Sequence, residues 1–133
     1  YGLETHLGMI QKHIHAFKPG VVIVDPISNF LGAGTQAEAG TMLLRLIDFL
    51  KSEQITSLFT HLNIGGGSLE QTDEGVSSII DSWLLMRDTE CDNERRSSLT
   101  ILKSRGMAHS REIRSFRLTD HGIELGDLTD HEC

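Results

Sequence analysis

The chain has 133 residues, which suits a single domain able to bury about two thirds of the surface that its unfolded form exposes. Its formal charge is −7, from 12 Lys and Arg against 19 Asp and Glu, and this argues against a broad nucleic-acid-binding face, which depends on phosphate contacts. The two cysteines do not suggest a disulfide framework, and with no signal peptide or long apolar run we expect a cytoplasmic protein without a membrane segment.

The first expected element is an amphipathic helix over residues 3–17. Apolar side chains recur along it at helical spacing and form one stripe. Pro19 and Gly20 then end the helix and lead directly into a strand. The residues of the stripe are Leu3, Leu7, Ile10, Ile14 and Phe17.

A buried strand is expected over residues 21–24. Its four β-branched residues show no alternation, which is typical of a parallel strand buried on both faces. Asp25 follows where the strand should stop, because Pro26 cannot donate to a sheet ladder. Four apolar residues and a terminal Asp form the Walker B pattern, in which the carboxylate serves Mg²⁺ on a nucleotide. A plain turn or cap residue is the structural alternative for Asp25.

A second helix and a second parallel strand are expected next. After a loop over residues 28–34, Thr35 and Glu38 fit a capping box that begins the helix. The strand over residues 55–62 would run parallel to the first, because a helix crosses between them. Near its end Thr60 is placed to orient a water or a phosphate oxygen, although a bond to local backbone is the simpler interpretation. The apolar face of the helix comprises Met42, Leu43, Leu46, Ile47 and Leu50.

The remaining sequence predicts an antiparallel meander. Strands over residues 79–86 and 98–104 form a hairpin across a charged loop at residues 89–96. A turn at residues 120–122 leads to a short closing strand at residues 123–125. The order helix, strand, helix, strand and then meander indicates a mixed α/β sheet.

A Walker B carboxylate needs a loop that holds the triphosphate, and no G-x-x-x-x-G-K-[ST] occurs in the chain. The glycines at residues 65–67 lack its spacing and its Lys-Ser/Thr. Either the chain does not bind nucleotide or the phosphate-binding half precedes it. Because the sequence opens directly into a helix, we favour a single partial domain over residues 1–133 that lacks the Walker A half.

At this point the residues resemble the carboxyl-terminal part of a KaiC domain, the RecA-like ATPase of circadian clock proteins. The resemblance covers most of the chain: FKPG before the Asp25 strand, VDPIS at its end, LFTH at the end of the next, Ile80-Asp81, and TDHGI near the end. Its most specific part is KSRGMAH at residues 103–109. It implies a RecA-like mixed sheet with an antiparallel carboxyl-terminal meander. It also implies a parent protein that forms six-membered rings and binds ATP and Mg²⁺ between subunits.

The resemblance also implies roles for individual residues. Asp25 would be the Mg²⁺-side carboxylate, acting indirectly on the metal, and with Thr60 it forms our candidate catalytic pair. Lys103, Arg105 and His109 match positions that reach the ATP of the neighbouring subunit. Two fixed cations beside a triphosphate would stabilise charge on the γ-phosphoryl group, as an arginine finger supplied in trans does. The structural alternative is an ordinary solvated strand end.

A serine/threonine autokinase activity is implied as well. Ser77 and Ser78 are candidate phosphoacceptors, with Thr72 a weaker third, although a Ser-Ser pair is common in any loop. The sequence departs from the family in mixing features of its two tandem domains, since the ending looks closer to the ATPase-only first domain and the hydroxyl pair to the second. Without the upstream phosphate loop we expect this chain alone to be inactive. Its partners would be copies of itself and other clock or signalling proteins.

Two other functions match parts of the sequence. A receiver-type signalling domain would use Asp25 as phosphoacceptor, with Thr60 and Lys103 at neighbouring strand ends, but the acidic pair that binds Mg²⁺ there is missing and Lys103 lies on an antiparallel hairpin. A DNA recombinase of the RecA superfamily is disfavoured by the acidic charge. For the isolated chain we expect self-association, because an unpaired edge and an uncovered apolar face would need covering.

Overall fold

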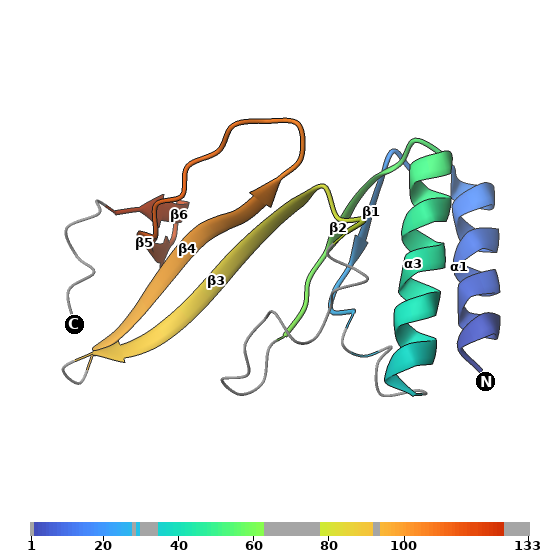
Figure 1. Cartoon of the computed structure of the whole chain (residues 1–133), viewed down its shortest axis with the longest axis horizontal. Helices are drawn as coiled ribbons and strands as arrows, with labels where there is room; N and C mark the ends of the chain where they lie inside the picture. Colours follow the sequence, from blue (N-terminus) through green and yellow to red (C-terminus); the bar gives the residue numbers. More distant parts are fainter. Residues whose placement is uncertain (1, 28, 30–34, 63–77, 92–93, 127–133) are drawn as a thin grey trace. The chain divides into compact units, whose positions relative to one another are not determined.

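The computed structural model describes residues 2–27, 29, 35–62, 78–91 and 94–126. The chain divides into two compact units, Tyr1–Ile79 and Ile80–Cys133, each described here by itself. The expected order of helix, strand, helix, strand and meander is confirmed (Figure 1). The described elements are α1 (Leu3–Phe17), β1 (Val21–Val24), α3 (Gln36–Ser52), β2 (Thr56–Phe59), β3 (Ser82–Cys91), β4 (Glu94–Ser104), β5 (Arg114–Thr119) and β6 (Gly122–Leu125).

Helix α1 has the predicted bounds. It ends where Lys18 takes the left-handed conformation, with φ of 51°, and the Lys18 amide donates to the Ile14 carbonyl at 2.7 Å. This reversal satisfies one of the last carbonyls of the helix and turns the chain toward β1. None of the helices in the described ranges is both long enough and apolar enough to cross a membrane.

Helix α3 begins with the predicted capping box. The Glu38 amide donates to Thr35 Oγ1 at 3.3 Å, and the Thr35 amide donates to Glu38 Oε2 at 2.9 Å. The bond from the Thr35 backbone, followed by the one from its hydroxyl, lowers the pKa of Glu38 because both favour the charged carboxylate. The box thus provides acceptors for the backbone amides of Thr35 and Glu38, which have no acceptor within the helix.

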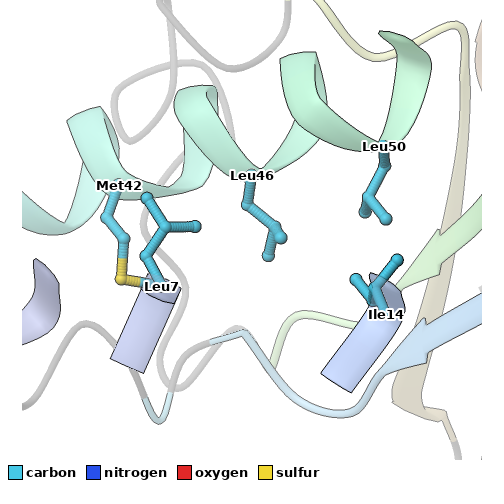
Figure 2. Packing of buried hydrophobic residues seen from close by; sticks show 5 residues of the cluster. All are labelled: Leu7, Ile14, Met42, Leu46 and Leu50. Atoms are coloured by element: carbon cyan, nitrogen blue, oxygen red, sulfur yellow. The ribbon is translucent and has the colours of Figure 1, made fainter. Parts of the chain in front are cut away.

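The core of the first unit lies between α1 and α3, which run side by side in the same direction (Figure 1). Leu46 and Leu50 of α3 are fully buried and face Leu7 and Ile14 of α1, while Met42 lies over Leu7 (Figure 2). Burying one such side chain contributes about 1.5–3 kcal/mol, so this cluster stabilises the packing of the two helices. Partly buried residues of the strands and of their flanks pack against it, namely Val22, Val24, Ile55 and Phe59.

Strands β1 and β2 pair in parallel, as predicted, with Val21 opposite Thr56 and Val24 opposite Phe59. The expectation that β1 is buried on both faces is wrong for the described residues. Exposure alternates along the strand, and Val21 and Ile23 are 59% and 63% exposed. The helices cover only the face of β1 that carries Val22 and Val24. Within the described part of the chain, Val21 and Ile23 on the opposite face are left exposed. Strand β2 is also shorter than the predicted 55–62.

The second unit is an antiparallel sheet in the order β3-β4-β5-β6. The predicted hairpin of β3 and β4 is confirmed, but the charged loop expected over residues 89–96 is wrong, because both strands continue through most of it. Glu90 faces Arg95, with a carboxylate–guanidinium distance of 3.8 Å, and Ser97 Oγ donates to Asp88 Oδ1 at 2.5 Å. Such cross-strand pairs stabilise a sheet even where the residues are polar.

The closing strand β6 follows the prediction of a turn at residues 120–122 and a short strand after it. Strands β5 and β6 pair in register from Phe116 opposite Leu125 to Thr119 opposite Gly122. Gly122 has φ of 114°, a conformation that favours glycine, so the residue type fits the tight turn.

Candidate functional site

Asp25 and Thr60 lie at the carboxyl ends of the neighbouring parallel strands β1 and β2. The Thr60 amide donates to the Val24 carbonyl at 3.0 Å, and the Thr60 carbonyl accepts from the Ile27 amide at 2.8 Å. These two bonds fix the backbone of Thr60 against residues on both sides of Asp25. Ligands in open α/β sheets bind at this edge, beyond the carboxyl ends of the strands.

The two side chains are in direct contact. Thr60 Oγ1 donates a hydrogen bond to Asp25 Oδ1, so the hydroxyl contacts the carboxylate and not only local backbone. Asp25 is exposed and Thr60 is half-buried. A donor bonded to one oxygen restricts the rotation of a carboxylate, so this bond fixes the orientation of the Asp25 side chain.

This arrangement fits a metal ion that arrives with a nucleotide. Mg²⁺ keeps several water ligands in such sites and takes one or two carboxylates together with phosphate oxygens. Among the residues that the structure describes, no three His, Cys, Asp or Glu side chains gather as a metal-binding group. The indirect role expected for Asp25 toward Mg²⁺ stays a prediction.

Lys103, Arg105 and His109 lie on one stretch of the second unit. Lys103 is near the end of β4, Arg105 follows the strand immediately, and His109 is half-buried in the segment before β5. Gly106, with φ of 73°, starts the turn after Arg105. The Arg105 side chain is 49% exposed, so its guanidinium is accessible to an anion from solvent.

One contact of Arg105 was missed from the sequence. Its amide donates to the Asp81 carbonyl at 2.7 Å, and its Nη1 lies 3.5 Å from Asp81 Oδ1. The available signal was the position of Asp81 just before one hairpin strand and of Arg105 just after the other. Opposite charges at the two open ends of a hairpin face each other when the register allows it.

The candidate phosphoacceptors are only partly described. Ser78 is exposed in a turn shortly before β3, whereas Ser77 and Thr72 lie outside the described residues. The loops expected at residues 28–34 and 65–67 lie mostly or wholly outside them too. The assignments of these residues stay predictions.

Comparison with known proteins decides the family. The family model described as "ATPase: KaiC" matches residues 1–130. The chain belongs to the KaiC ATPase family. Its RecA-like α/β class is thereby established, with the parallel strands and the antiparallel meander that were expected. The receiver-type alternative finds no support, since Lys103 lies on the antiparallel strand β4.

Curated relatives of this KaiC-family chain agree. It is 44% identical over 127 residues to the circadian clock protein KaiC2 of Synechocystis sp., a match that covers 94% of the chain and 22% of the relative. It is 36% identical over 127 residues to KaiC3 of the same organism, covering 93% of the chain and 25% of the relative. It is 30% identical over 129 residues to the circadian clock oscillator protein KaiC of Synechococcus elongatus, a match that covers 95% of the chain and 24% of the relative. The chain thus spans about a quarter of the length of the relatives it matches.

Proposed function

We propose that this chain supplies two parts of an ATP site in a KaiC-type ATPase. Asp25 and Thr60 would serve the Mg²⁺ side of the nucleotide bound by the same subunit. Lys103, Arg105 and His109 would approach the nucleotide of a neighbouring subunit in a six-membered ring. The observation that carries the proposal is the hydrogen bond from Thr60 to Asp25 at the carboxyl edge of the parallel sheet.

The chemistry required of these residues is positional and electrostatic. When bound, MgATP supplies the γ-phosphoryl group and a metal that neutralises part of its charge. Asp25 would hold and orient a metal-bound water, while the Thr60 hydroxyl keeps the carboxylate in one orientation. Arg105 and Lys103 would stabilise the negative charge on the transferring group, for which a guanidinium offers five donors in a fixed fork.

Hydrolysis of ATP would then belong to the assembled parent protein in the cytoplasm, and the chain alone would be inactive. Six identical subunits in a closed ring present the same surface to each neighbour, so every site combines Asp25 of one subunit with Arg105 of the next. Copies of itself are the first partner, and other clock or signalling proteins are further ones.

The test is ATP turnover by the full-length protein that contains this chain. Asp25→Asn keeps the size of the side chain but removes its charge, and we expect kcat to fall at least about tenfold, a loss of about 1.4 kcal/mol of transition-state stabilisation. Asp48→Asn is the matched control, because Asp48 is an exposed carboxylate on α3 of the same unit. Unchanged turnover by the Asp25 variant would refute the proposal.

Mixing subunits tests the contribution in trans. Rings assembled from equal amounts of Asp25→Asn and Arg105→Ala subunits should regain about a quarter of full activity, because about one interface in four pairs an intact Asp25 with an intact Arg105. If both residues acted within one subunit, mixing would restore nothing.

The proposed autokinase activity needs a separate measurement. We expect phosphate on Ser77 or Ser78, and less on Thr72, when the full-length protein is incubated with MgATP and analysed by mass spectrometry. Phosphate confined to other residues would contradict these acceptors without touching the ATPase proposal.

A further inference from the structure

The open end of the β3–β4 hairpin is where Arg105 is held. Regular pairing of the two strands ends with Ser82 opposite Ser104. The amide of Arg105 then donates to the Asp81 carbonyl at 2.7 Å, which extends the ladder by one bond. Gly106 turns the chain away directly afterwards. The backbone of Arg105, the residue directly after β4, is therefore still fixed by the hairpin.

A β-bulge decides which residue faces Arg105. Leu84 pairs with Ile101, whereas Trp83 pairs with Lys103, so Leu102 is an additional residue in β4. If Leu102 were instead paired with Trp83, the register would continue unshifted and Asp81 would face Ser104. Bulges of this kind often redirect a side chain near a functional site.

The bulge brings two opposite charges together. Arg105 Nη1 lies 3.5 Å from Asp81 Oδ1, and the two side chains are 49% and 56% exposed. An arginine side chain has many rotamers, and a carboxylate beside its terminal nitrogen favours those that keep the guanidinium over the hairpin end. A guanidinium has five N–H donors in a planar fork, so it can bond to a carboxylate and to a phosphate oxygen at the same time.

We infer that Asp81 is a positioning residue, which orients the Arg105 guanidinium toward the phosphates of a nucleotide on the neighbouring subunit. The inference rests on the proposed function, because it assigns Arg105 the same phosphate ligand. Asp81 itself does not contact the nucleotide. Its effect passes through Arg105 and is expected in the catalytic step, where charge on the phosphoryl group is stabilised.

The experiment measures kcat and KM for ATP in the full-length protein. Asp81→Asn should lower kcat about two- to fivefold, the factor that exposed ion pairs supply, with little change in KM. Asp81→Glu keeps the charge and should recover most of the loss. In an Arg105→Ala background, Asp81→Asn should have no further effect, because the two residues act as one unit.

Glu90→Gln is the matched control. Glu90 is an exposed carboxylate of β3, the strand that Asp81 precedes, and it also pairs with an arginine, Arg95, but at the other end of the hairpin. A purely structural role for Asp81 would give both variants similar losses of thermal stability and similar kinetics. We expect the kinetic change in the Asp81 variant alone.

The outcomes separate the two proposals. If Arg105→Ala lowers kcat and Asp81→Asn does not, the inference about Asp81 is wrong and the proposed function stands. An equal loss from Asp81→Asn with and without Arg105 would also overturn it. If Arg105→Ala leaves turnover unchanged, the role of Arg105 in trans fails, and the role of Asp81 fails with it.

Discussion

Replacing Thr60 by valine removes a single hydroxyl from the candidate site. The shape of the side chain is nearly kept, and the backbone bonds of Thr60 to Val24 and Ile27 do not involve the side chain, so the strand end should keep its place. What is lost is the hydrogen bond to Asp25 Oδ1. Hydrogen bonds to charged groups contribute about 1.5–3 kcal/mol, and the exposure of Asp25 argues for the lower end of that range.

If this bond orients Asp25 in the transition state, about 1.4 kcal/mol corresponds to a tenfold fall in kcat. The assay is steady-state ATP hydrolysis by the full-length protein over a range of Mg²⁺ concentrations. Thr60→Ser keeps the hydroxyl and should stay within about twofold of the unaltered protein. Thr56→Val, an exposed threonine at the start of the same strand, is the control for a general effect on β2. A Thr60→Val protein with unchanged kcat and unchanged Mg²⁺ dependence would show that the hydroxyl does not support Asp25.

Three further predictions concern stability and assembly. Leu46→Ala opens a cavity in the fully buried cluster between the helices and should lower the free energy of unfolding by about 2–5 kcal/mol, measured in urea; a loss below about 1 kcal/mol would contradict this packing. The lowered pKa of Glu38 means that its cap stabilises the fold above the ordinary carboxyl pKa of 4.5 and that this contribution disappears as pH falls through the lowered value. Glu38→Gln should therefore flatten the pH dependence of thermal unfolding below pH 4.5, and an unaltered slope would argue against the capping box as its source. The isolated chain should self-associate in gel filtration at micromolar concentration, and Ile23→Lys on the exposed face of β1 should reduce this; a monomer before substitution would contradict the expectation.

Local patterns predicted much of the fold. The stripe of α1, the cap of α3 and the turn at Gly122 each depend on residues close together in sequence, so their signals are complete within one segment. The charged stretch at residues 89–96 misled the prediction because cross-strand pairing, which depends on a second segment, stabilises it as strand. The exposure of Val21 and Ile23 likewise depends on what covers the sheet and not on their own type.

In the candidate site too, sequence patterns predicted some contacts and missed one that depends on a distant segment. Asp25 and Thr60 were placed together because parallel neighbours end at one edge of a sheet, and the structure has their side chains in contact. The pairing of Asp81 with Arg105 was missed because it depends on the register shift between Trp83 and Leu84, and no local pattern announces where an additional residue enters a ladder. Assignment of Lys103 and its neighbours to a nucleotide came from the family resemblance alone.

The additional residue in β4 also limits how this hairpin can be engineered. In a strand, side chains alternate between faces, so a slip of one residue in the pairing turns all those beyond it to the opposite surface. A variant of this hairpin that kept Leu102 but paired it with Trp83 would therefore leave the sequence around Arg105 intact while placing Ser104 opposite Asp81 and turning Arg105 to the other face. Chimaeras made from this segment need to be aligned on the bulge and not on the charged residues that follow it.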